Sequence, residues 1–277
     1  MTSPLEITLD SGVVRGRLDR GLRTWRAIPY ATAPTGPRRF RAPQPVEAWH
    51  GVRPAEAFGS PSPQRKSNFD ENSLFVNVVA PQVPSDSLRP VMVFIHGGAY
   101  NGGNPSTPMY RGTSLVERGD IVYVSIQYRL GALGYLDFSE YSTAEQSFET
   151  NLGLRDQIAA LTWVQRNIAA FGGDPNAVTV FGESSGANAV TTLMATPAAR
   201  GCSPGPSLKV RRLLRHTEKS ERTVGHASSS RSHRLRMRSG IVAALRFGEG
   251  PGRCRRRTCA PRRGRRTRNA GICPRGG

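Results

Sequence analysis

A serine flanked by glycines stands in the middle of residues 179–190, which read Thr-Val-Phe-Gly-Glu-Ser-Ser-Gly-Ala-Asn-Ala-Val. The Gly-x-Ser-x-Gly spacing is typical of a serine nucleophile on a sharp turn between a strand and a helix. The same spacing also occurs in glycine-bounded turns without a catalytic function. A strand-like run precedes Ser184 and small residues follow it, and this context favours the nucleophile. Such a serine needs a histidine and an acid to activate it.

A second short stretch, His96-Gly-Gly-Ala99, could stabilise negative charge. It follows the apolar run Pro90–Ile95. Its small side chains allow backbone N–H groups to approach the oxyanion of a tetrahedral intermediate, where such donors contribute strongly to catalysis. We interpret His96 as a structural residue that holds this loop, not as the catalytic base. Asp174-Pro175 is interpreted as a turn, and His50 has only a polar loop around it.

Strands and helices that could position these residues alternate along the chain. Continuous apolar runs, which suit strands covered on both faces of a sheet, occur at residues 74–80, 90–95, 121–126 and 178–181. Residues 153–170 carry apolar side chains at helical spacing and end at two glycines and a proline, which commonly terminate a helix. Another helix is expected over residues 187–195. The alternation predicts an α/β fold with a mostly parallel sheet.

The charge of the chain is concentrated at its C-terminal end. Residues 201–277 hold 21 of the 39 Lys and Arg residues and 3 of the 20 Asp and Glu residues, a formal charge of +18, whereas residues 1–200 carry +1. All four cysteines follow residue 200, and of the aromatic residues only Phe247 does. We therefore expect a globular domain over residues 1–200 and an arginine-rich, disordered tail over residues 201–277.

The expected cellular compartment follows from the sequence features that target a protein to membranes or secretion. The first ten residues show no signal-peptide pattern, and no apolar run approaches the roughly 18 residues of a membrane span. A domain without cysteine needs no oxidising compartment. We expect a cytoplasmic protein without a membrane partner.

Short motifs spread over residues 1–200 indicate the protein class more specifically than the composition does. They lie at residues 27–31, 36–40, 96–100, 128–131, 153–157, 163–164, 167–168, 171–175 and 181–186. Taken together, these segments resemble the type B carboxylesterase family of α/β-hydrolases. Many short motifs in the same order are far more specific than one Gly-x-Ser-x-Gly pattern.

This resemblance implies an α/β-hydrolase fold, with a mostly parallel sheet and flanking helices, truncated after the helix that follows the nucleophile. It implies hydrolysis of small-molecule carboxylic esters through an acyl-enzyme. Ser184 would be the nucleophile, and the amides of Gly98, Ala99 and Ser185 would form the oxyanion hole. Neither a cofactor nor a metal is expected, and the oligomeric state stays open.

The sequence departs from the family pattern in three places. Residues 71–74 read Glu-Asn-Ser-Leu where the family usually has Glu-Asp-Cys-Leu, so the family's first disulfide cannot form here. Ser185 replaces the alanine that usually follows the nucleophile, although its backbone N–H is still available. The resemblance stops near Gly201, before the motifs that carry the family's acid and histidine.

The tail offers other titratable residues in place of those motifs. None of them stands in a strand-end or glycine-loop setting that would position it, and we interpret them as incidental. They are His216, His226, His233, Glu218, Glu221 and Glu249.

A shift of reading frame near residue 201 is the favoured hypothesis for the origin of the tail. One set of synonymous codons for residues 201–210, read from its third base, translates as Leu-Phe-Ala-Arg-Ala-Ile-Ala-Gln-Ser, which resembles the continuation expected in the family. Residues 251–277 contain 10 Arg, 5 Gly, 3 Pro and 2 Ala, the composition expected of a GC-rich gene read out of frame. The alternative is a non-enzymatic protein whose basic tail binds nucleic acid through phosphate contacts.

Two further expectations concern the tail. Cys254, Cys259 and Cys273 lack zinc-module spacing and a fourth ligand, so no metal site is expected. With nearly no aromatic residues, the tail has no means of specific base stacking, and no specific nucleic-acid partner is expected.

If the tail is disordered, the strand at 178–181 has no following strand to pair with, and we expect it to be an exposed edge.

Overall fold

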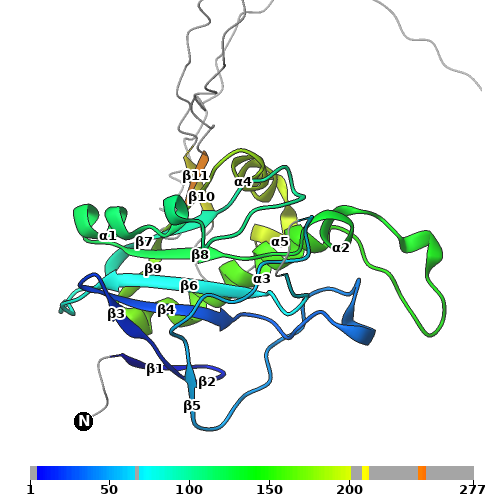
Figure 1. Cartoon of the computed structure of the whole chain (residues 1–277). Helices are drawn as coiled ribbons and strands as arrows, with labels where there is room; N and C mark the ends of the chain where they lie inside the picture. The colour runs from blue at the N-terminus through cyan, green and yellow to red at the C-terminus, as the bar shows by residue number, and fades with distance from the viewer. Residues whose placement is uncertain (1–4, 66–68, 201–207, 212–242, 248–277) are drawn as a thin grey trace, which may run out of the picture.

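The computed structural model describes residues 5–65, 69–200, 208–211 and 243–247, which form two sheets and their flanking helices (Figure 1). The smaller sheet has the strand order β1-β2-β5, and the larger sheet has the order β10-β11-β9-β7-β8-β6-β4-β3. The strands are β1 (Glu6–Leu9), β2 (Gly12–Arg15), β3 (Arg17–Asp19), β4 (Leu22–Pro29), β5 (Val52–Pro54), β6 (Phe75–Pro81), β7 (Arg89–Ile95), β8 (Val122–Ile126), β9 (Gly173–Gly182), β10 (Leu208–Arg211) and β11 (Ala243–Phe247).

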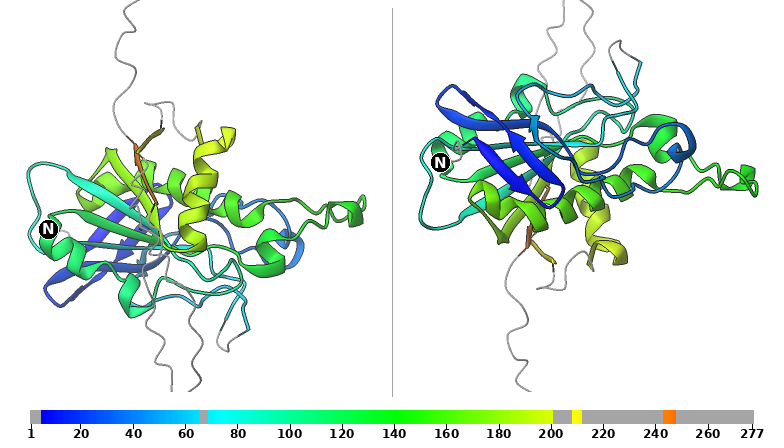
Figure 2. Two further views of the ribbon diagram at one scale, coloured as in Figure 1. Left: turned by 90° about the horizontal axis from the view of Figure 1, so that it is seen from above. Right: turned by 90° about the horizontal axis from the view of Figure 1, so that it is seen from below.

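Helices lie on both faces of the larger sheet. They are α1 (Thr113–Gly119), α2 (Gly131–Tyr135), α3 (Leu152–Asn167), α4 (Ser185–Ala195) and α5 (Pro197–Arg200), with 3-10 turns η1 (Gly36–Arg38), η2 (Pro108–Tyr110), η3 (Ser139–Tyr141) and η4 (Ile168–Phe171). The segment between α2 and α3, which contains η3, projects away from the sheet (Figure 2). Among the described residues, no helix is long and apolar enough to cross a membrane.

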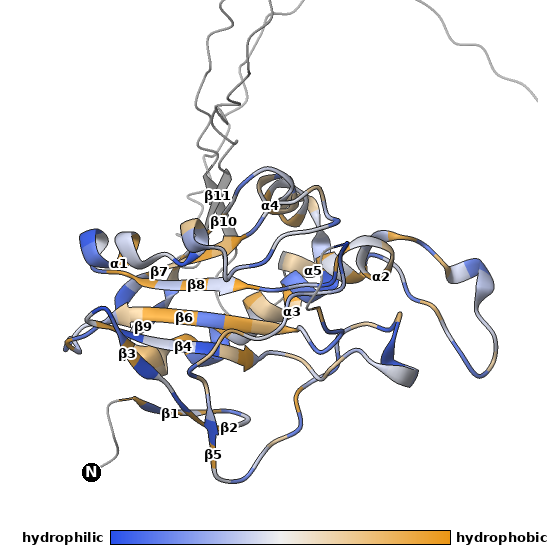
Figure 3. Ribbon diagram, in the orientation of Figure 1, coloured by the Kyte–Doolittle hydropathy of each residue, from blue (hydrophilic) through white to orange (hydrophobic). Residues whose placement is uncertain are grey.

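The core consists of apolar side chains on both faces of the central strands. Figure 3 shows hydrophobic residues along β6 and β8, as the continuous apolar runs predicted. Along β7, Val91, Val93 and Ile95 join the larger core cluster together with residues of α3 and α4, whereas Phe94 joins a smaller cluster that contains Val116 of α1. Successive side chains of β7 point to opposite faces of the sheet, so the strand contributes to two core clusters, one beneath α1 and the other beneath α3 and α4.

Within the described larger sheet, parallel pairing occurs only at the centre, and in the smaller sheet β2 also pairs in parallel with β5. β7 pairs in parallel with β8 on one side and with β9 on the other. The other described neighbours in this sheet pair antiparallel. The α/β prediction is confirmed, but the expectation of a mostly parallel sheet is wrong, because the described larger sheet is mixed and is parallel only where β7, β8 and β9 end together.

Two sequence-based expectations concern β9. Asp174-Pro175, where a turn was expected, lies in the first half of this strand, where the pairing with β7 is irregular and the Asn176 N–H donates to Asp174 Oδ1 at 2.8 Å. The expectation that this strand forms an exposed edge is wrong. β11 pairs antiparallel with it from Ala243 opposite Gly182 to Phe247 opposite Val178, so its backbone groups find partners in the tail.

β10 and β11 show that residues 208–211 and 243–247 of the predicted disordered tail belong to the larger sheet. The remaining residues of the tail lie outside the described part of the chain.

A buried ion pair joins Arg129, in the segment that follows β8, to Asp156 of α3. The Arg129 guanidinium donates to Asp156 Oδ2 at 2.8 Å and to Oδ1 at 2.6 Å, and the Arg129 backbone N–H also donates to Oδ2 at 3.1 Å. The side chain of Arg129 is 3% exposed and that of Asp156 is fully buried. A third guanidinium contact reaches the Arg41 carbonyl oxygen at 2.7 Å, so the pair also holds the loop before β5.

Replacing Asp156 by alanine should lower the free energy of unfolding by about 3–5 kcal/mol, because it leaves a buried guanidinium without its counter-charge. Denaturant unfolding measures the change. Glu56→Ala is the matched control, since the Glu56 carboxylate pairs with Arg15 at 3.4 Å and both side chains are about half exposed. The control should cost about 0–1 kcal/mol. Equal losses in the two variants would contradict the structural role of the buried pair.

Candidate active site

Ser184 lies on a strained turn between β9 and α4. Its backbone has φ 54° and ψ −122°, a conformation that side chains rarely adopt and that costs on the order of 1–3 kcal/mol. The residue is exposed, and no described group hydrogen-bonds its hydroxyl. Strain held at an exposed hydroxyl is typical of a residue whose position matters for function.

The two glycines around Ser184 are required by the close approach of backbone to backbone. A Cβ on Gly182 would lie 2.4 Å from the backbone carbon of Gly186. A Cβ on Gly186 would lie 2.1 Å from the carbonyl oxygen of Ile95, the last residue of β7. Any larger residue would separate α4 from the strands beneath it, and this is the physical basis of the spacing seen in the sequence.

The loop after β7 lies directly against this turn. A Cβ on Gly97 would lie 2.5 Å from Glu183 Oε2 and 2.9 Å from Ser184 Cβ. The next three residues have positive φ angles: 120° at Gly98, 53° at Ala99 and 59° at Tyr100. Successive residues of this kind turn their N–H groups away from regular pairing, as in backbone concavities that bind anions.

Several amides at this junction have no acceptor among the described residues, and those of Gly98, Ala99 and Ser185 are among them. The neighbouring amides are used: Tyr100 N–H donates to Ser185 Oγ at 3.4 Å, and Gly186 N–H donates to the Glu183 carbonyl oxygen at 2.8 Å. The assignment of Gly98, Ala99 and Ser185 to an oxyanion hole stays a prediction. Ser185 is the first residue of α4, where the helix dipole favours negative charge.

His96 is buried beneath the loop and faces away from solvent. Its ring stacks on Tyr128 with centroids 4.5 Å apart, and Nδ1 lies 2.9 Å from the Gly97 carbonyl oxygen. Tyr128 donates its hydroxyl to the His96 carbonyl oxygen at 2.6 Å. Burial lowers the pKa of His96 to about 4, so the ring is neutral at pH 7. These contacts are those of a residue that holds the loop.

Glu183 contacts a residue that sequence reasoning missed. The Tyr110 hydroxyl, from η2, donates to Glu183 Oε2 at 3.2 Å. The Tyr110 ring packs on Phe94 of β7, with centroids 4.8 Å apart. Tyr110 lies in no motif, and its place beside the turn is decided by how η2 folds over β7.

The other histidines and acids of the sequence do not contact Ser184 in the described part of the chain. His50 is exposed on the loop before β5. The tail candidates His216, His226, His233, Glu218, Glu221 and Glu249 lie outside the described residues, as do Cys254, Cys259 and Cys273. Within the described residues, no group of three or more His, Cys, Asp or Glu side chains could hold a metal ion.

Comparison with known proteins identifies the family of this chain. A family model described as the carboxylesterase family matches residues 3–204. The chain belongs to the carboxylesterase family. It is 46% identical over 205 residues to para-nitrobenzyl esterase of Bacillus subtilis (strain 168), and the matched region covers 70% of this chain and 41% of that protein. It is 40% identical over 222 residues to cocaine esterase of Oryctolagus cuniculus, and this matched region covers 72% of this chain and 40% of that protein.

Solved structures of carboxylesterases share the fold. A structure of PNB esterase superposes with a TM-score of 0.68 at 43% identity and covers 76% of this chain and 45% of that one. Geobacillus stearothermophilus carboxylesterase EST55 at pH 6.2 also gives a TM-score of 0.68, at 42% identity. The α/β-hydrolase prediction is therefore confirmed, and the chain spans less than half the length of the curated relatives it matches here.

The low pKa of His96 makes the stability of the fold depend on pH. The folded chain keeps His96 neutral down to pH about 4, whereas an unfolded chain protonates it below about pH 6.5. The unfolded state thus binds the extra proton, and stability should fall by about 3 kcal/mol as pH drops from about 6.5 to about 4.

Urea unfolding of the wild type and of His96→Gln across this range tests the effect. The variant should lose this component of the pH slope, and the exposed-site control His50→Gln should keep it. Equal slopes in all three proteins would contradict the assignment.

Ser185 ties the loop to the turn through its hydroxyl. Ser185→Ala removes the acceptor of the Tyr100 N–H and should cost about 0.5–1.5 kcal/mol of stability. It should also speed amide hydrogen exchange at Tyr100. Ser114→Ala, at an exposed position of α1, should change neither quantity. Unchanged exchange at Tyr100 in Ser185→Ala would contradict the contact.

Proposed function

We propose that this chain carries the nucleophile-bearing part of a serine carboxylesterase that hydrolyses small-molecule carboxylic esters through an acyl-enzyme. The observation that carries the proposal is the strained, exposed Ser184 packed against a loop in which the amides of Gly98 and Ala99 have no described acceptor. Membership of the carboxylesterase family supports the ester substrate class.

In the proposed reaction, Ser184 Oγ attacks the ester carbonyl carbon while a base removes the hydroxyl proton. The carbonyl oxygen becomes an oxyanion and accepts hydrogen bonds from the amides of Gly98, Ala99 and Ser185. Collapse of the tetrahedral intermediate expels the alcohol and leaves an acyl group on Ser184. Water then attacks the acyl carbon, and the carboxylic acid leaves as Oγ regains a proton.

We propose that hydrolysis is impaired in the chain as given, because its base and acid are absent in the form that the resemblance requires. Among the described residues, no histidine side chain is hydrogen-bonded to Ser184. His96 cannot serve, since its ring is buried and its Nδ1 is directed at the Gly97 carbonyl oxygen. A shift of reading frame near residue 201 would account for this loss. The proposal needs no cofactor or specific nucleic-acid partner, and it places the protein in the cytoplasm.

Activity measurements on two forms of the gene test this proposal. The 277-residue chain should hydrolyse p-nitrophenyl acetate barely above background and resist fluorophosphonate labelling, because loss of the base costs about 10⁶ in turnover in a triad enzyme. Restoring one base near codon 201 should switch on both signals. Ser184→Ala in the restored form should abolish them, and Ser114→Ala should leave them unchanged.

Two outcomes would contradict the proposal in different ways. Vigorous hydrolysis by the 277-residue chain, abolished by Ser184→Ala, would show that the tail supplies a base, and His216, His226 and His233 would be replaced next. A restored gene without esterase activity, combined with salt-dependent DNA binding by the 277-residue chain, would favour the non-enzymatic alternative.

A further inference from the structure

The loop after β7 is closed on itself by backbone hydrogen bonds. The Gly98 carbonyl oxygen accepts the Asn101 N–H at 3.0 Å and the Gly102 N–H at 3.1 Å. A Cβ on Gly98 would lie 2.1 Å from the Gly102 carbonyl oxygen, so the two ends of this turn are in direct contact. A shift of residues 102–103 would therefore move the Gly98 and Ala99 amides as well.

Gly103, the next residue, packs against the beginning of the same loop. Its φ angle is 100°, and a Cβ there would lie 2.3 Å from the Gly97 carbonyl oxygen and 2.7 Å from His96 Nδ1. These approaches leave no room for a side chain at Gly103. Its backbone N–H and carbonyl groups are therefore the groups through which another segment can hold it by hydrogen bonds.

The side chain of Gln64 supplies these hydrogen bonds. Gln64 Oε1 accepts from the Gly103 N–H at 3.1 Å, and Gln64 Nε2 donates to the Gly103 carbonyl oxygen at 3.1 Å. Nε2 also donates to the Ser62 carbonyl oxygen at 3.1 Å, so both of its protons are used. The carboxamide thus pairs with one residue in both directions, as the backbone of a neighbouring antiparallel strand would.

Gln64 is itself anchored through Ser62, two residues before it. Ser62 Oγ donates to the Tyr128 carbonyl oxygen at 2.7 Å and lies 2.8 Å from Ser73 Oγ, and both serines are fully buried. Ser73 stands where the family pattern has a cysteine, and here a hydrogen bond between hydroxyls holds the segment. Tyr128 also donates its hydroxyl to the His96 carbonyl oxygen at 2.6 Å, so the segment and the loop share one anchor.

We propose that Gln64 is a positioning residue for the reaction proposed at Ser184. Its carboxamide fixes Gly103, and Gly103 keeps the Gly98 and Ala99 amides aimed at the place of the oxyanion. No described hydrogen bond joins Gln64 to Ser184, so it acts through the loop. The inference rests on the proposed function, because these amides stabilise developing charge only in that reaction. Donors that are fixed beforehand need no reorganisation in the transition state.

Amide hydrogen exchange in the 277-residue chain tests the contact without any need for activity. Gln64→Met keeps the length of the side chain and removes both hydrogen bonds to Gly103. Exchange at the Gly103 N–H should become about tenfold faster, because this proton loses its acceptor. Gln44→Met is the matched control, since Gln44 is exposed and its Nε2 donates to the Ala42 carbonyl oxygen. The control should leave exchange at Gly103 unchanged.

A conservative variant separates hydrogen bonding from side-chain packing. In Gln64→Glu, a protonated carboxyl group can both accept from the Gly103 N–H and donate to its carbonyl oxygen, whereas a carboxylate can only accept. Protection of Gly103, corrected for the intrinsic pH dependence of exchange, should therefore be higher at about pH 5 than at about pH 8. Gln64→Met should stay unprotected at both. His96 is neutral at both pH values, because burial lowers its pKa to about 4.

Kinetics of the form with the restored reading frame test the positioning role. With p-nitrophenyl acetate as substrate, Gln64→Met should lower kcat about tenfold and leave KM unchanged, because the amides act on the transition state and not on the bound ester. Gln44→Met should change neither constant. A variant that only loosened the fold would lower the amount of active enzyme, which titration with a fluorophosphonate measures separately.

Three results would overturn the inference. Unchanged exchange at Gly103 in Gln64→Met would show that Gln64 does not hold the loop. Equal protection of Gly103 at both pH values in Gln64→Glu would show that hydrogen bonding is not the means. Faster exchange with an unchanged kcat would leave a local contact without a role in the reaction. A restored gene without esterase activity would refute the proposed function and the positioning role with it, while exchange at Gly103 would still decide whether the contact exists.

Discussion

The parallel pairing of β7 with β9 is the constraint on which the rest of the candidate active site depends. In this register Ile95 lies opposite Gly182, so the two strands end at the same level. The chain then leaves both strands side by side, and residues distant in the sequence come within contact distance. Gly186 lies so close to the Ile95 carbonyl oxygen that a Cβ at this position would be 2.1 Å from it. A residue with a Cβ at that point would separate the turn from the loop that faces it.

Buried polar contacts hold this junction from below. Tyr128 and His96 stack, and Tyr128 donates to the backbone of the loop after β7. One residue further along the chain, Arg129 anchors the end of β8 to Asp156 of α3. The strain at Ala99, Tyr100 and Ser184 persists because these contacts and the β7–β9 pairing over-determine the backbone. Donors left without acceptors are therefore fixed in place before any substrate arrives.

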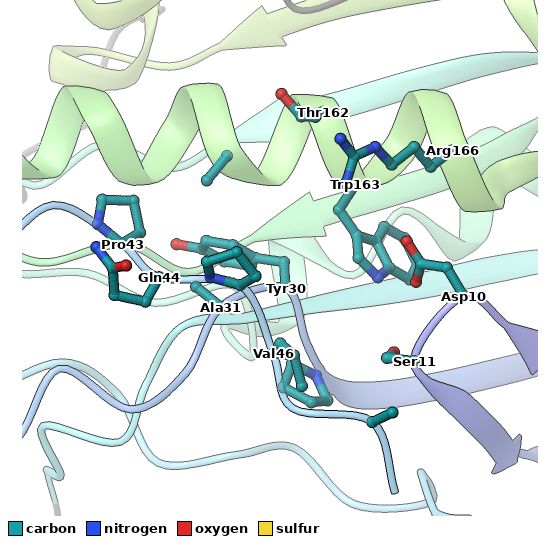
Figure 4. A pocket seen from close by; sticks show the side chains of 14 residues that line it. Asp10, Ser11, Tyr30, Ala31, Pro43, Gln44, Val46, Thr162, Trp163 and Arg166 are labelled. Atoms are coloured by element: carbon teal, nitrogen blue, oxygen red, sulfur yellow. The ribbon is translucent and has the colours of Figure 1, made fainter.

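Among the described residues, polar groups without a described partner occur both on the backbone and on side chains. At the turn they are backbone amides exposed by unusual φ angles, and their position is set by the strands beneath. Beside α3 they belong to the side chains of Ser11 and Trp163, and both residues line one cavity (Figure 4) because the β1–β2 turn lies against a helix from the middle of the chain.

The sequence by itself determined the parts of this protein that depend on local pattern. Apolar runs and glycine positions placed the strands at 90–95 and 121–126, the long helix of residues 153–170 and the turn at Ser184, because each of these rests on neighbouring residues. Pattern could not show that β11 pairs with β9, since a strand of five residues in an arginine-rich tail carries no distinctive period. Nor could it place Tyr110 beside Glu183, or bring Ser11 and Trp163 to one cavity. Those contacts join segments far apart in the chain, and only the packing of the folded sheet and helices decides them.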